Sequence, residues 1–106
     1  MEAEQPPFFS GATIAIFGLG LMGGSLALAL REARWADRVV GIDREAATLA
    51  AAEAAGAIDA GTTDLAAGIA AADVVLLATP VRTILRLLPE VGRRARSGAL
   101  IMDLGS

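Results

Sequence analysis

The sequence of 106 residues predicts an α/β protein built on a doubly wound parallel sheet of about five strands in the order 3-2-1-4-5. Short apolar runs alternate with longer Ala- and Leu-rich segments of helical length. A glycine-rich turn joins the first apolar run to the first of these segments. A later run, residues 74–78, is apolar without alternation, which is typical of a parallel strand buried on both faces.

The composition supports this fold and excludes several functions. Hydrophobic residues make up 55% of the chain but aromatic residues only 4%, so the core is expected to be aliphatic. The net charge of −3 and the lack of a basic cluster argue against a nucleic-acid partner. The chain has no Cys and no His, which excludes disulfides, thiol catalysis and Cys/His zinc sites, and no metal site is expected.

The first ten residues differ from the rest of the chain. Residues 1–10 are acidic at the start and contain Pro6-Pro7, which predicts a flexible lead-in before a single domain over 11–106. They have the features of neither a signal peptide nor a transit peptide, and no apolar run reaches 18 residues. We therefore expect a soluble, cytoplasmic protein with no membrane partner.

The first half of the domain reads as two strand–helix units and a third strand. Gly56 stands where a helix is stopped by a residue of left-handed conformation. In order, we expect a strand at 12–17, a helix at 21–33, a strand at 38–42, a helix at 45–55 and a short strand including Ala57-Ile58.

The second half continues the alternation. Asp64 is the expected N-cap of a short helix. Pro89 is expected to kink the last helix or divide it in two. In order, we expect a helix at 65–71, a strand at 73–78, a helix after Thr79-Pro80 that carries Ile84, Leu85, Leu87, Leu88 and Val91, and a strand at 99–102.

The turn after the first strand has the glycine spacing of a dinucleotide-binding unit. Gly18 permits the tight turn, Gly20 lets the backbone approach a pyrophosphate, and Gly23 lets the helix pack closely on the first strand. The start of the helix then offers unpaired N–H groups and a partial positive charge to the phosphates. In this context the motif predicts a Rossmann fold.

An acidic residue at the end of the second strand completes the pattern. Asp43 follows Gly23 by 20 residues, close to the roughly 20 expected for the carboxylate that binds the adenosine ribose. Asp43 would repel the 2′-phosphate of NADP, whereas Arg44 after it would attract it. We expect the carboxylate to dominate and the cofactor to be NAD.

Ligands of doubly wound sheets bind beyond the carboxyl ends of the strands, where the strand order reverses. The loop at Gly18, the Thr79-Pro80 loop and the Gly105-Ser106 end should therefore converge.

Ser25 either reaches a phosphate or, as helical serines more often do, bonds back to its own helix. Asp103 is expected to cap a turn rather than act as a base. The remaining arginines are expected on solvated helix faces: Arg31, Arg34, Arg86, Arg93, Arg94 and Arg96.

Five segments resemble the prephenate dehydrogenase family, which includes arogenate dehydrogenases: GLGLMGGSLALAL, GIDR, GAIDAGTTD, ATPVRTI and IMDLGS. The resemblance covers the chain after the lead-in. It implies NAD-dependent oxidative decarboxylation of prephenate to 4-hydroxyphenylpyruvate in tyrosine biosynthesis, with prephenate or arogenate as the small-molecule substrate. It also implies a helical C-terminal domain through which the full-length protein forms a homodimer.

The resemblance also implies roles for individual residues. The catalytic histidine and the helical domain would follow Ser106, so the chain is expected to bind the cofactor without catalysing the reaction. By position, the pyrophosphate loop is matched by Gly18, Gly20, Leu21, Met22 and Gly23, and the ribose-binding acid is matched by Asp43. Arg44 matches the residue beside the adenine, and the loop near the nicotinamide ribose is matched by Thr79, Pro80 and Val81. Ser106 matches the active-site serine.

Two alternatives remain open from the sequence. The segment GLGLMG also resembles the start of β-hydroxyacid dehydrogenases, although the ending Asp-Leu-Gly-Ser suits the prephenate family better. A non-catalytic nucleotide-sensing regulatory domain shares the strand, glycine loop and acidic residue.

Overall fold

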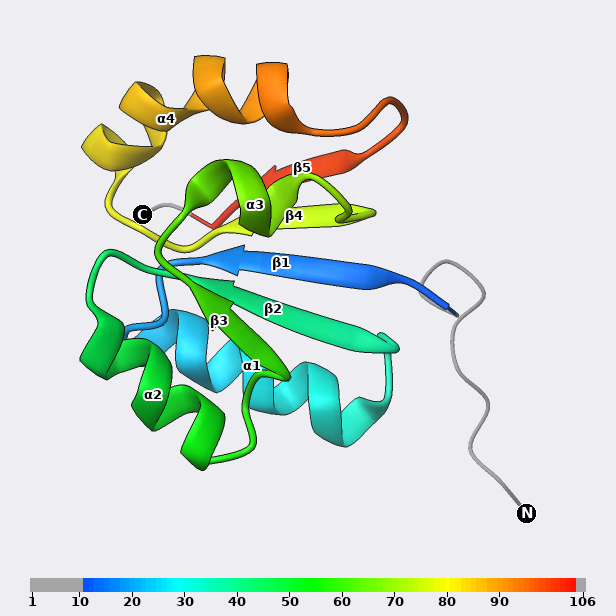
Figure 1. Ribbon diagram of the computed structural model, residues 1–106, viewed down its shortest axis with the longest axis vertical. Coiled ribbons are helices and arrows are strands. Elements are labelled where there is room, and N and C mark those ends of the chain that lie inside the picture. Colours follow the sequence, from blue (N-terminus) through cyan, green and yellow to red (C-terminus); the bar gives the residue numbers. More distant parts are fainter. Residues whose placement is uncertain (1–10, 105–106) are drawn as a thin grey trace.

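The computed structural model describes residues 11–104, and every strand in this range belongs to one parallel sheet (Figure 1). The order β3-β2-β1-β4-β5 confirms the predicted doubly wound topology. The elements are β1 (Thr13–Phe17), α1 (Leu21–Ala33), β2 (Arg38–Ile42), α2 (Ala46–Ala54), β3 (Ala60–Thr62), α3 (Leu65–Ile69), β4 (Val74–Leu77), α4 (Val81–Arg94) and β5 (Leu100–Asp103). The predicted lead-in at 1–10 and Ser106 lie outside the described residues.

Helices cover both faces of the sheet, with α1 and α2 on one side and α3 and α4 on the other (Figure 1). Alternate residues of each central strand serve the two faces. In β1, Ile14 and Ile16 join the core under α1 and α2, whereas Ala15 and Phe17 join the core under α3 and α4. Both cores are aliphatic apart from Phe17, as the composition predicts.

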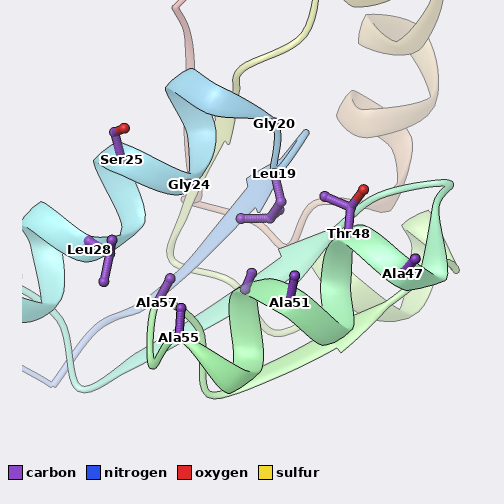
Figure 2. Close-up of a pocket in the computed structure, with 11 residues that line it drawn as sticks. Leu19, Gly20, Gly24, Ser25, Leu28, Ala47, Thr48, Ala51, Ala55 and Ala57 are labelled. Carbon is purple, nitrogen blue, oxygen red and sulfur yellow. The ribbon is translucent and has the colours of Figure 1, made fainter.

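A groove runs between α1 and α2 and extends to the turn after β1 (Figure 2). Its volume is about 540 Å³. Leu28 on α1 faces Ala51 and Ala55 across it, and small side chains line most of its length (Figure 2). Because alanine side chains are short, the two helices leave this space open between them.

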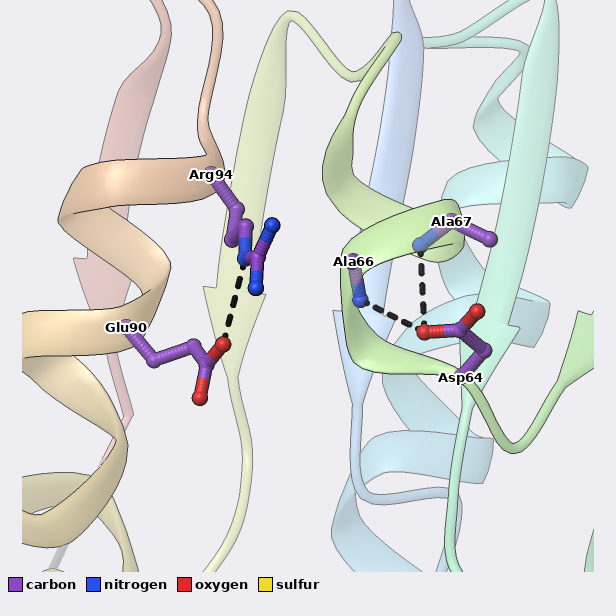
Figure 3. Close-up of polar contacts among 5 residues, drawn as sticks. All are labelled: Asp64, Ala66, Ala67, Glu90 and Arg94. Carbon is purple, nitrogen blue, oxygen red and sulfur yellow. Dashed lines mark hydrogen bonds and ion pairs between the residues drawn. The ribbon is translucent and has the colours of Figure 1, made fainter.

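On the opposite face, α3 and α4 carry local polar contacts that hold their own turns (Figure 3). Asp64 caps α3 as predicted, since its Oδ1 accepts hydrogen bonds from Ala66 N at 3.0 Å and Ala67 N at 3.5 Å. In α4, Arg94 Nε donates to Glu90 Oε2 at 3.1 Å. This pair is one helical turn apart and exposed, so it adds at most about 0.5 kcal/mol to the stability of the helix.

Two predicted elements are corrected. The third strand is Ala60–Thr62 and not Ala57-Ile58; the latter two residues are buried in the core beneath α1 and α2, where packing accounts for their hydrophobicity. Pro89 does not divide the last helix, because α4 continues through it. Proline has no N–H, so Pro89 cannot donate the helical hydrogen bond to the carbonyl of Leu85. Both residues are exposed, so water can donate to that carbonyl instead.

The other predicted boundaries are confirmed to within a residue or two. Gly56 follows α2 with φ +77°, the left-handed conformation that ends a helix. Of the described residues, no helix has both the length and the apolar character needed to cross a membrane.

Candidate dinucleotide-binding site

The carboxyl ends of β1 and β4 lie side by side, and the strand order reverses between them. The turn after β1 and the loop after β4 diverge there toward opposite faces of the sheet, because α1 and α4 cover opposite faces (Figure 1). In doubly wound sheets, ligands bind at this carboxyl edge, where the strand order reverses. The predicted site residues that the structure describes lie around this edge.

Gly18 turns the chain sharply at the end of β1. Its φ of +95° favours glycine, and its N–H donates to the Ile42 carbonyl at 2.7 Å. A Cβ at this position would lie 2.7 Å from Thr79 Cγ2 and 2.9 Å from the Ala78 carbonyl oxygen. The tight turn predicted at Gly18 therefore brings the end of β1 close to the end of β2 and to the loop after β4.

Gly23 is required for packing, but its contact differs from the predicted one. A Cβ on Gly23 would lie 1.8 Å from the Gly18 carbonyl oxygen and 3.4 Å from Ala78 Cβ. The first turn of α1 thus packs on its own entry turn and on the loop after β4, rather than on the body of β1.

Gly20 has no such packing role. Apart from its chain neighbours, no atom of the described residues would lie within 4 Å of a Cβ at this position, and its backbone conformation, φ −68° and ψ −157°, is open to any L-residue. The space beside Gly20 is therefore free for a ligand. The backbone here is as exposed as close approach to a pyrophosphate requires.

The N-terminus of α1 is arranged to receive an anion. Gly20 is the N-cap and provides no side chain for the first N–H groups, which belong to Leu21, Met22 and Gly23. The first turn contains no acidic residue that would neutralise the helix dipole. Four N–H groups at the start of any helix lack helical partners, so here they are available to a phosphate.

Asp43 connects the end of β2 to the glycine turn. Its Oδ2 accepts a hydrogen bond from Leu19 N at 2.8 Å, and its Oδ1 accepts one from Glu45 N at 2.9 Å. The half-buried carboxylate is thereby held beside the turn, with one acceptor position of each oxygen in use. It keeps further acceptor capacity for the hydroxyls of a ribose.

The loop after β4 contributes Thr79, Pro80 and Val81. Pro80 is the N-cap of α4, which begins at Val81. Thr79 Oγ1 is buried and has no hydrogen-bond partner among the described residues. A buried hydroxyl without a partner costs about 1–3 kcal/mol, so this group is one that a bound ligand would satisfy.

Arg44 lines a separate small pocket at the same edge of the sheet. The pocket has a volume of about 230 Å³ and is formed by Phe17, Arg44, Thr83, Arg86 and Leu87. It is smaller than the roughly 300–1,000 Å³ typical of a complete small-molecule site, so it can hold only part of a dinucleotide. Phe17 and Leu87 provide apolar surface, and the two arginines provide positive charge.

Sequence reasoning missed the α4 residues of this pocket. Arg86 was expected on a solvated helix face, and Thr83 and Leu87 were not considered as site residues. The available signal was their spacing: positions three and four apart share one face of a helix. Arg31 and Arg96 are exposed and form ion pairs with Asp59 and Asp73.

The remaining expected site residues are distributed as follows. Ser25 is exposed and lines the α1–α2 groove, whose lining also includes Gly20 (Figure 2). Asp103 ends β5, and the next residue returns to the sheet through a hydrogen bond from Leu104 N to the Leu77 carbonyl at 3.0 Å. The end of β5 thus reaches the same edge as the glycine turn. The predicted catalytic residue, Ser106, lies outside the described residues.

Known proteins are similar to this chain in sequence and in fold. A family model described as "Prephenate dehydrogenase, nucleotide-binding domain" matches residues 26–106. A prephenate dehydrogenase of Bacillus subtilis (strain 168) is 40% identical over 98 residues, which cover 89% of this chain and 26% of that protein.

Solved structures agree. Prephenate dehydrogenase from A. aeolicus, crystallised in complex with hydroxyphenyl propionate and NAD+, superposes with a TM-score of 0.82 at 31% identity, covering 90% of this chain and 34% of that one. Synechocystis arogenate dehydrogenase gives a TM-score of 0.81 at 31% identity, covering 89% of this chain and 33% of that one. The chain thus spans about a quarter of the Bacillus protein and about a third of the solved chains. On the strength of the family match, this chain belongs to the nucleotide-binding domain family of prephenate dehydrogenases.

Proposed function

We propose that this chain binds NAD and is the nucleotide-binding domain of a longer prephenate dehydrogenase. The observation that carries the proposal is the first turn of α1, which presents uncapped N–H groups beside an open Gly20. Asp43 is held next to this turn by its bond to Leu19 N. The A. aeolicus relative whose structure was solved with NAD+ supports the choice of cofactor.

The residues present fit such a cofactor in three independent ways. The space beside Gly20 admits a pyrophosphate to the N-terminus of α1, where Leu21, Met22 and Gly23 supply N–H donors. The Asp43 carboxylate has acceptor capacity for the adenosine ribose hydroxyls.

The third fit concerns the loop after β4. The Thr79 hydroxyl, which has no hydrogen-bond partner among the described residues, would gain one from a polar cofactor bound at this edge of the sheet. With Pro80 and Val81, Thr79 forms the wall that we assign to the nicotinamide ribose. Arg44 and the pocket beside it are assigned to the adenine end.

In the longer enzyme this domain would orient the cofactor against the substrate. A cofactor held by the α1 N-terminus and Asp43 would supply the hydride acceptor for the oxidative decarboxylation of prephenate to 4-hydroxyphenylpyruvate. The role proposed for Ser106 is a hydrogen bond to the substrate hydroxyl. The 106 residues contain no histidine, so the base that removes the hydroxyl proton is assigned to residues beyond them.

The same proposal covers the setting of the whole protein. We assign to it prephenate or arogenate as substrate, a helical C-terminal domain that forms a homodimer, and a cytoplasmic location in the tyrosine pathway. Accordingly, the 106-residue chain should bind NAD without turning over prephenate. Prephenate-dependent formation of NADH by this chain alone would contradict the division of roles.

Two substitutions at Gly20 test the proposed cofactor site. Both Gly20→Asn and Gly20→Asp introduce a good N-cap without a clash, so both should keep or raise the stability of α1. The aspartate also places a negative charge where the pyrophosphate is proposed to bind. Isothermal titration with NAD should therefore show that Gly20→Asp lowers affinity at least about tenfold more than Gly20→Asn does. Equal affinities for the two folded variants would refute pyrophosphate binding at this turn.

A further inference from the structure

Two arginines from distant parts of the chain line the same small pocket. Arg44 follows Asp43 at the end of β2, and Arg86 lies in the second turn of α4. Both are exposed, and both line the pocket of about 230 Å³ together with Thr83. Within residues 11–104, neither forms an ion pair with an acidic residue; the arginines that do are Arg31, Arg94 and Arg96.

This arrangement leaves two positive charges on one pocket. Guanidinium groups that line a common space repel each other, and solvent screens the repulsion only in part. An anion between them would relieve the repulsion and would accept hydrogen bonds from both. Arginine is suited to this because its planar fork matches the oxygens of a phosphate.

The carboxylate of Asp43, which precedes Arg44 in the chain, is already engaged. The two oxygens of Asp43 each accept a backbone N–H, from Leu19 and from Glu45. These donors reduce the negative potential that Asp43 directs toward the ribose. Glu45 is exposed and is the N-cap of α2, a helix that covers the face of the sheet opposite α4 (Figure 1). The repulsion of a 2′-phosphate by Asp43 is therefore opposed by two guanidinium groups.

We infer that Arg86, together with Arg44, receives the 2′-phosphate of NADP, so that the chain binds NADP as well as NAD. Arg86 is then a specificity-determining residue at the adenosine end of the site. This inference rests on the proposed dinucleotide site, and it adds to that site a recognition element on α4. An arginine close to the ribose-binding acid is the residue type that accommodates a 2′-phosphate in this fold.

The test compares Arg86→Gln with Arg93→Gln. Arg93 lies in the last turn of α4, is exposed and does not line the pocket, so the control removes the same charge from the same helix. Affinities for NAD and NADP are measured by isothermal titration. Arg86→Gln should weaken NADP binding about tenfold or more, because a charged hydrogen bond is lost, while NAD binding changes less than about twofold. Arg93→Gln should leave both affinities as they are.

A second measurement isolates the phosphate. Adenosine 2′,5′-bisphosphate and 5′-AMP differ only in the 2′-phosphate, and the preference for the bisphosphate should disappear in Arg86→Gln. An equal loss of NAD and NADP affinity in Arg86→Gln would overturn the inference. The same ratio of NADP affinity to NAD affinity in Arg86→Gln and in Arg93→Gln would also overturn it. Binding of NAD but not of NADP by the wild-type chain would overturn the inference and leave the proposed function standing. Binding of neither would overturn both.

Discussion

The carboxylate of Asp43 accepts a hydrogen bond from the backbone N–H of Leu19 at 2.8 Å, and this contact ties the end of β2 to the glycine turn after β1. The residue expected to bind the ribose is thus also a support for the pyrophosphate loop. Its second oxygen accepts from Glu45 N at 2.9 Å, which holds the start of the following turn. One side chain therefore couples the placement of two parts of the proposed site.

Replacing Asp43 should consequently affect both stability and binding. Asp43→Ala leaves the N–H of Leu19 and that of Glu45 without an acceptor, which should lower the free energy of unfolding by about 1–3 kcal/mol in urea denaturation. Asp43→Asn keeps one carbonyl oxygen as an acceptor and should lower the free energy of unfolding by less than Asp43→Ala does. Asp37→Ala serves as a control for an exposed aspartate. Equal stability of the Asp43→Ala and Asp37→Ala variants would show that the bond to Leu19 contributes nothing.

Neighbouring glycines in the first turn of α1 should respond in opposite ways. Gly23→Ala places a Cβ 1.8 Å from the Gly18 carbonyl oxygen and should destabilise the domain severely or prevent folding. Gly24→Ala places its Cβ 3.6 Å from the Leu19 carbonyl oxygen, an ordinary contact. It should raise the free energy of unfolding by about 0.5–1 kcal/mol, because alanine is the better helix former. Thermal unfolding followed by circular dichroism gives both values, and a well-folded Gly23→Ala variant would contradict the tight entry turn.

Removing the Thr79 hydroxyl should separate stability from binding. The hydroxyl oxygen is buried without a partner among the described residues, so Thr79→Val should raise the free energy of unfolding by about 1 kcal/mol in the absence of cofactor. It should also weaken NAD binding by about tenfold, because the hydrogen bond proposed for that hydroxyl is lost. Thr79→Ser keeps the hydroxyl and should keep the affinity. Undiminished NAD binding by Thr79→Val would exclude the proposed contact.

Acid should weaken the fold partly through Asp59. Burial raises the pKa of this carboxyl, but the hydrogen bond from Val39 N and the hydrogen bond and positive charge of Arg31 outweigh burial and bring the pKa below its ordinary 3.8. A carboxyl whose pKa is lowered in the folded state stabilises the fold above 3.8 and loses that contribution as the pH falls through the lower, folded value.

The pH dependence of Asp59→Asn tests this assignment. The wild type should lose more free energy of unfolding than this variant as the pH is lowered from 5 through about 4 and below, because only the wild type must protonate the ion-paired carboxyl. The measurement is a series of urea titrations at fixed ionic strength. Parallel pH profiles for the two proteins would show that Asp59 does not contribute to acid unfolding.

Errors in the predicted fold fall where local pattern carries little information. β3 has only three residues, and its middle residue is Gly61, so it shows no alternation that marks a strand. Ala57 and Ile58 are more hydrophobic than the residues of β3, so the strand was predicted there. Both residues instead belong to the buried core beneath α1 and α2. Pro89 indicated a break in the last helix, but α4 continues through it. Pro89 is exposed, so water can replace the backbone hydrogen bond that proline cannot donate.

The strand order, the glycine turn and the position of Asp43 after the second strand were predictable from the amino-acid sequence, because they depend on hydrophobic periodicity and on residues close together in the chain. The folded arrangement was needed to find that a side chain at Gly20 would meet no described residue beyond its chain neighbours, that Asp43 supports the turn at Leu19, and that Thr79 Oγ1 has no partner among the described residues. The pocket shared by Arg44 and Arg86 likewise depends on tertiary structure, because α4 begins at the edge of the sheet where β2 ends. Contacts of this kind join residues far apart in the chain, and no local pattern encodes them.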